Sequence, residues 1–98
     1  MTKTSETSRN TLINILKASG VWAEDRWGNF KYTGSTLSGD YRFKFNTTSV
    51  RFEKKVVFDS GSVKSDWINI ASDYYKNIKF VEDKVSFGKK TLNNKIFQ

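Results

Sequence analysis

The stretch DYRFKFNTTSVRFEKKVVF, residues 40–58, decides the fold of this chain. Residues 41–45 alternate between aromatic and cationic side chains, and residues 50–58 return to a period of two after a polar turn. Because alternate side chains of a β-strand point to opposite faces, each run predicts a strand with one apolar and one charged face. The apolar face of the second run is formed by Val50, Phe52, Val56 and Phe58, with Lys54 interrupting it. The stretch therefore predicts two neighbouring strands joined by a turn.

The residues before this stretch predict one helix and one further strand. Residues 9–19 carry an apolar face at helical spacing, with Ser8 able to cap the start and Gly20 placed to end the helix. That face is formed by Leu12, Ile13, Ile15 and Leu16. Residues 27–33 predict a strand with a turn or bulge at its Gly-Asn pair, and residues 33–39 predict a flexible loop.

The residues after the stretch predict a second helix and a short strand. Residues 66–77, capped by Ser65, have apolar side chains at helical spacing. These are Trp67, Ile70, Ala71 and Tyr74, and the spacing continues to Ile78 just beyond the helix. Residues 78–81 predict a strand, with which residues 85–87 pair. The predicted fold class is α+β, a single αβββαβ domain in which an antiparallel three-stranded meander is flanked by two helices.

Length and composition narrow the class of protein. We expect a flexible N-terminus at 1–8, one domain at 9–88 and a basic C-terminal tail at 89–98. The 98 residues include no cysteine and no histidine, which excludes disulfides, thiolate metal sites and histidine-based catalysis. The sequence has no apolar run of about eighteen residues and no apolar core of a signal peptide near Met1, so we expect a cytoplasmic protein without a membrane partner.

The net charge indicates a polyanionic partner. Seventeen Lys and Arg against ten Asp and Glu leave a charge of +7, and such a field attracts phosphates. Nucleic acid is therefore the expected partner, DNA before RNA, although a charge of this size also serves solubility. Abundant Lys, Asn, Ile and Phe, which have AT-rich codons, favour a phage or another mobile element as the source.

Two carboxylates and a lysine form the candidate catalytic site. Glu53 and Lys55 share a face of one predicted strand, and Asp40 begins the neighbouring strand. Two carboxylates can hold one Mg²⁺ or Mn²⁺, which activates a bound water and neutralises charge on a phosphate. We therefore predict Asp40 and Glu53 as metal ligands and Lys55 as the lysine that stabilises the developing charge. The predicted phosphate contacts are Arg42, Lys44, Lys54 and Lys64.

The acidic-x-Lys pattern alone carries little information. Residues 82–84 also fit it, and exposed Glu-Lys pairs are common on strands. Its interpretation depends on the predicted place of Glu53 on the third strand.

In that setting the chain resembles the PD-(D/E)xK nuclease superfamily, most of all the small Holliday-junction resolvases and the replication-repair nucleases of phages. The resemblance covers residues 6–81: Glu6 precedes a helix, Asp40 follows a glycine-containing loop, and Phe52-Glu53-Lys54-Lys55 matches the family's apolar-Glu-x-Lys. It implies an αβββαβ core, a Mg²⁺- or Mn²⁺-dependent endonuclease acting on DNA phosphodiesters, and a homodimer.

Two alternatives remain at this point. The order of elements is also that of double-stranded RNA-binding domains, and aromatics interleaved with cations around Trp27 and in residues 41–44 can stack unpaired bases, which favours a non-catalytic nucleic-acid binder. The size and the 15% aromatic content also suit a mobile-element protein that inhibits or modulates a host protein by direct contact.

Overall fold

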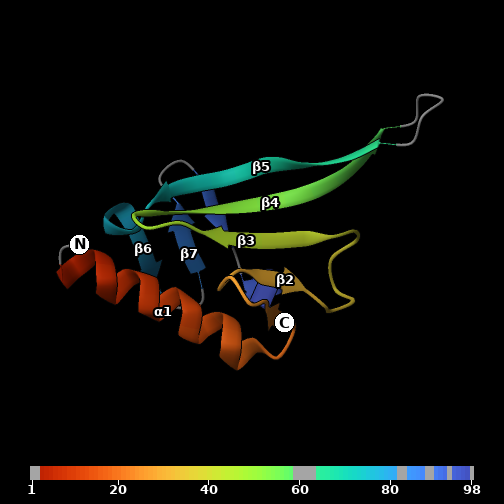
Figure 1. Ribbon diagram of the computed structural model, residues 1–98. Helices are drawn as coiled ribbons and strands as arrows, with labels where there is room; N and C mark the ends of the chain where they lie inside the picture. The colour runs from red at the N-terminus through yellow and green to blue at the C-terminus, as the bar shows by residue number, and fades with distance from the viewer. Residues whose placement is uncertain (1–2, 59–63, 82–83, 88–89, 93, 98) are drawn as a thin grey trace.

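The chain folds into two antiparallel sheets and one N-terminal helix. Figure 1 shows the computed structural model, which describes residues 3–58, 64–81, 84–87, 90–92 and 94–97. In chain order the elements are α1 (Lys3–Ser19), β1 (Trp22–Glu24), β2 (Phe30–Tyr32), β3 (Tyr41–Phe45), β4 (Ser49–Phe58), β5 (Lys64–Tyr74), the 3₁₀ helix η1 (Tyr75–Asn77), β6 (Ile78–Val81), β7 (Lys84–Phe87), β8 (Lys90–Leu92) and the 3₁₀ helix η2 (Asn94–Phe97).

The strands form a five-stranded meander and a separate three-stranded meander. The first sheet has the order β1-β2-β3-β4-β5 and the second the order β6-β7-β8, with every neighbouring pair antiparallel. Within the described ranges there is one α-helix and there are eight strands. The predicted αβββαβ order, with a three-stranded meander between two helices, is therefore wrong.

The error lies in the predicted second helix. Residues 66–77 form most of β5, which pairs along the whole of β4, followed by η1. The register shifts between Phe52 and Glu53, whose partners are Ala71 and Asn69, so Ile70 is an extra residue in β5. Such a bulge breaks the period of two. The apolar residues then recur at spacings of three and four, which imitates a helix.

The predicted first helix and central strands are confirmed. The helix ends at Ser19, followed by Gly20 at φ 75°, and it begins at Lys3 rather than at Arg9. The strand Tyr41–Phe45 has the predicted bounds, and β6 and β7 pair as expected. The predicted strand at 27–33 is shorter, since β2 covers Phe30–Tyr32 and a turn separates it from β1.

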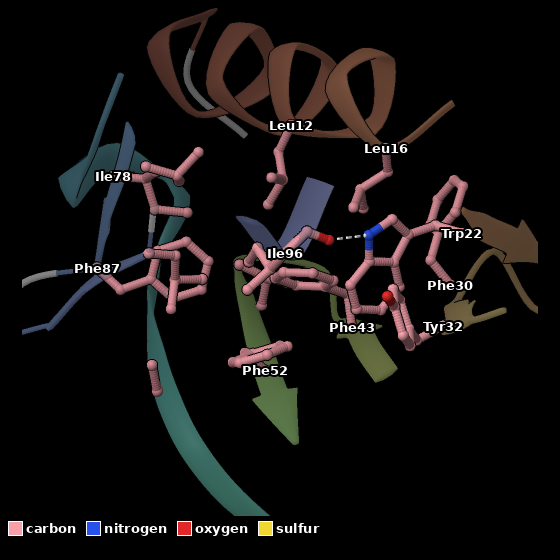
Figure 2. Packing of buried hydrophobic residues seen from close by; sticks show 14 of the residues in the cluster. Leu12, Leu16, Trp22, Phe30, Tyr32, Phe43, Phe52, Ile78, Phe87 and Ile96 are labelled. Atoms are coloured by element: carbon pink, nitrogen blue, oxygen red, sulfur yellow. Dashed lines mark hydrogen bonds between the residues drawn. The ribbon is translucent and has the colours of Figure 1, made fainter. Parts of the chain in front are cut away.

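One aromatic core joins the helix to both sheets. In Figure 2, Leu12 and Leu16 point from α1 toward the rings of Trp22 and Phe43. The indole Nε1 of Trp22 donates a hydrogen bond of 2.7 Å to the carbonyl oxygen of Ile96. Ile96 and Leu92 are both buried in this core and come from the segment predicted as a tail, so residues of this segment pack within the domain.

The first sheet has an inner face and an outer face. The inner face carries Phe30, Phe43 and Phe52, which pack in the core with residues of α1 and the second sheet. Beyond β3, the hairpin of β4 and β5 continues as a two-stranded ribbon (Figure 1). The outer face of β2 to β5 carries most of the cationic side chains of these strands, and the candidate site lies there.

Candidate functional site

Cations from three strands gather on the outer face. Cross-strand pairs place Lys31 beside Arg42, and Lys44 beside Arg51. Lys55 of β4 lies opposite Trp67 of β5. We define the cationic face by the side chains that share this side of the sheet: Lys31, Arg42, Lys44, Arg51, Glu53, Lys55 and Trp67.

The alternation of the strands produces this face. Phe43 and Phe52 are buried and paired with each other, so their neighbours along the chain must point to the other side. Phe30 and Tyr32 are buried in the same way, which turns Lys31 outward. Burial of the aromatic residues therefore determines where the cations lie.

Glu53 is the centre of the cationic face. It is 2% exposed, and no other charged residue among the described side chains is buried. Its Oε1 accepts a hydrogen bond of 2.6 Å from Nε of Arg42, and its Oε2 lies 3.1 Å from Nη2 of Arg51. The guanidinium carbon of Arg42 lies 4.2 Å from the ring centroid of Trp67. One carboxylate therefore anchors two guanidinium groups, one of which also stacks on an indole.

Asp40 lies beside the part of β4 that follows Glu53, whereas Arg51 precedes Glu53 on the same strand. The carbonyl oxygen of Asp40 accepts a hydrogen bond of 2.9 Å from the amide of Lys55, which places Asp40 opposite Lys55 and diagonal to Glu53. Diagonal positions on one face of a sheet are about 7–8 Å apart. The register brings the three predicted catalytic residues, Asp40, Glu53 and Lys55, to one region of the sheet, while the carboxylate of Glu53 binds the two arginines.

The residues do not fit a magnesium or manganese centre in this arrangement. Both oxygens of Glu53 already bind a guanidinium group, and a divalent cation there would face two positive charges at close range. Among the described residues, no group of three or more Asp, Glu, His or Cys side chains is placed to hold a metal ion.

The predicted phosphate contacts divide between the two faces. Arg42 and Lys44 belong to the cationic face, whereas Lys54 lies on the opposite side, its Nζ 5.5 Å from the ring centroid of Tyr41. Lys64 begins β5, and its side chain is outside the described residues.

Three members of the cationic face were missed by sequence reasoning. Lys31 could have been found from its place between two aromatic residues, and Arg51 from its alternation with Val50 and Phe52. Trp67 was assigned to a helix, so its place on a strand was hidden.

A pocket of about 220 Å³ lies at the rim of the cationic face. It is lined by Asp25, Asn29, Phe30, Lys31, Arg42 and Trp67. The turn between β1 and β2 is held firmly, because Oδ1 of Asp25 accepts hydrogen bonds of 2.9 Å from the amides of Trp27 and Asn29. Oδ1 of Asn29 in turn accepts a bond of 2.9 Å from the amide of Phe45. The pocket thus combines two aromatic residues and two cations with two short polar side chains on a fixed turn.

No protein-family model, curated protein or solved structure matches this chain. In the part of the chain that the structure describes, no helix has the length and apolar character needed to cross a membrane.

Proposed function

We propose that this protein binds nucleic acid through the cationic face of its first sheet. The observation that carries the proposal is the pairing of like charges: Lys31 lies opposite Arg42, and Lys44 lies opposite Arg51. Like charges directly opposite each other destabilise a sheet, whereas a face that serves solubility alone would do better with mixed signs. Two such pairs on one face favour a phosphate-bearing ligand that relieves the repulsion.

The charge balance of the face supports binding to phosphates. Glu53 compensates part of the charge of Arg42 and Arg51, while Lys31, Lys44 and Lys55 form no salt bridge with any described residue. Each phosphate contact to single-stranded nucleic acid contributes about 0.7 to the slope of log K against log salt. The three lysines alone predict a slope of about −2, and all five cations a slope of about −3.5.

The proposed activity is binding without catalysis. The nuclease interpretation depended mainly on the predicted αβββαβ order, which the fold does not have. The residue pattern at Asp40, Glu53 and Lys55 is its remaining support. The Mg²⁺-dependent endonuclease, the homodimer, the host-protein partner and the cytoplasmic location all stay predictions.

The first experiment measures binding of fluorescently labelled DNA by anisotropy over a range of salt concentrations. Lys44→Ala should weaken binding and reduce the salt slope by about 0.7 on a single strand or about 0.9 on a duplex. The matched control is Lys79→Ala, because Lys79 is also an exposed lysine within a strand but belongs to the second sheet. Equal effects of the two substitutions would show that the total charge, not the cationic face, governs binding.

The same samples test the nuclease prediction. Wild-type protein is incubated with labelled DNA and Mg²⁺ or Mn²⁺, and the products are separated by size. Metal-dependent cutting that is lost in Glu53→Gln would overturn the non-catalytic proposal. Absence of salt-dependent binding in wild-type protein would instead favour the alternative interpretation, a protein that acts by direct contact with a host protein.

A further inference from the structure

We infer that the rim pocket is a subsite for one unstacked nucleobase, so that the preferred ligand is single-stranded nucleic acid. This inference rests on the proposed function and adds the class of nucleic acid. The pocket opens between the β1–β2 turn and Trp67, with Lys31 and Arg42 among its lining residues. It lies within the area where the phosphates would be held.

The lining has the chemistry that a single base requires. The indole of Trp67 and the guanidinium of Arg42 are flat groups on which a base can stack, and such stacking accepts any base because each has a π-face. The ammonium of Lys31 can contact the adjoining phosphate. Asp25 and Asn29 place a carboxylate and an amide at the rim, where they can pair with the polar edge of a base.

The size of the pocket suits one ring system. Its volume of about 220 Å³ is below the roughly 300–1,000 Å³ of sites that take drug-sized molecules. A nucleobase fits this description better than a dinucleotide or a folded peptide segment does. The rest of the strand would then lie over the lysines of the open sheet.

The pocket is organised before any ligand arrives. Arg42 is fixed on one side by its 2.6 Å bond to Glu53 and on the other by Trp67. The side chain of Asp25 is fixed by two amides of the turn, and that of Asn29 by the amide of Phe45 in β3. Groups already held in place lose little conformational freedom on binding, so a weak stacking contact can contribute most of its energy.

A base in a duplex cannot reach this pocket without leaving its stack. Extrusion costs a few kcal/mol, least where the base is already unpaired. Duplex DNA should therefore bind through the lysines alone, and a single strand should bind through both the lysines and the pocket. The preference for single strands depends on the ring of Trp67.

The test compares three labelled ligands of equal length: an oligothymidylate of about twelve nucleotides, the same strand with abasic sites throughout, and a duplex. Wild-type protein should bind the oligothymidylate more tightly than the other two. Trp67→Leu should weaken oligothymidylate binding about 5- to 150-fold, with little change in the salt slope or in binding of the abasic strand. Trp67→Phe should retain most of the affinity.

The matched control is Tyr74→Leu, which removes an exposed aromatic residue from the same strand outside the pocket. Thermal unfolding by circular dichroism shows whether each variant is folded. The inference is overturned if the abasic strand binds as tightly as the oligothymidylate, or if Tyr74→Leu matches the effect of Trp67→Leu. Those results would leave the proposed function standing, whereas salt-independent or absent binding of all three ligands would overturn both.

Discussion

Replacing Glu53 by glutamine tests whether one buried carboxylate holds the cationic face together. The substitution keeps the size of the side chain and an accepting oxygen, and it removes the negative charge from between Arg42 and Arg51. Because the side chain of Glu53 is 3% exposed, its interactions are screened less than those of a surface pair. We expect a measurable loss of folding stability.

The magnitude follows from the two contacts. The 2.6 Å bond to Arg42, whose side chain is 30% exposed, is of the charge-assisted kind that contributes about 1.5–3 kcal/mol. Arg51 is 43% exposed and lies 3.1 Å from the carboxylate, so solvent reduces its contribution to about 0.2–1 kcal/mol. Glutamine keeps part of the first bond. The expected loss is about 2 kcal/mol, or about 8–16 °C in Tm for a domain of this size.

The assay is urea denaturation followed by far-ultraviolet circular dichroism. The matched control is Glu24→Gln, since Glu24 is 44% exposed and lies 3.8 Å from Lys17. Its loss should stay below about 0.5 kcal/mol, as for most surface ion pairs. If Glu53→Gln costs no more than Glu24→Gln, or stabilises the fold, then Glu53 does not hold the two arginines in place and the reasoning fails.

Two further predictions concern the core. Burial raises the pKa of Tyr75 above its usual 10.0 despite the opposing charge of Arg9. The fold therefore favours the neutral phenol. As the pH rises through 10 and beyond, the free energy of unfolding of the wild-type protein should fall more steeply than that of Tyr75→Phe. The free energy of unfolding of both proteins is measured by urea denaturation at several pH values across that range. An equal dependence on pH in the two proteins would contradict this prediction. Trp22→Phe removes the donor to the carbonyl of Ile96 and should cost about 1–3 kcal/mol; an unchanged midpoint of denaturation would show that this bond does not secure the C-terminal segment.

The sequence predicts the centre of the fold well and its edges poorly, for a physical reason. Residues 41–45 alternate strictly between aromatic and cationic side chains. A period of two of this kind predicts a strand with one face toward the core, which the structure has. In β5 the extra residue at Ile70 shifts the alternation by one position, and the apolar residues on either side of it acquire helical spacing. A bulge depends on the partner strand, so a single-strand pattern could not reveal it.

The sequence predicts several residues of the candidate site, but it does not predict the contacts that they make. Alternation places Glu53 and Lys55 on one face, as the structure shows. Pairing across strands decides what Glu53 contacts, and the structure gives it Arg42 on the next strand and Arg51 two residues away on its own strand. The role of the carboxylate thus depends on a register that the sequence pattern does not contain.

The arrangement of charge on this sheet is costly for folding and therefore informative. Two pairs of cations lie directly opposite each other on neighbouring strands, Lys31 with Arg42 and Lys44 with Arg51. A single buried carboxylate, that of Glu53, offsets part of the repulsion within these pairs. A carboxylate at Lys44, for example, would remove one repulsive pair and create an attractive one with Arg51. A sequence that keeps the repulsive pair, and adds a buried glutamate to hold two guanidinium groups in fixed positions, gives up stability on one face of the sheet. Such a departure from the most stable choice is expected where a surface serves a ligand, and the positive charge of this face is the reason that we propose an anionic one.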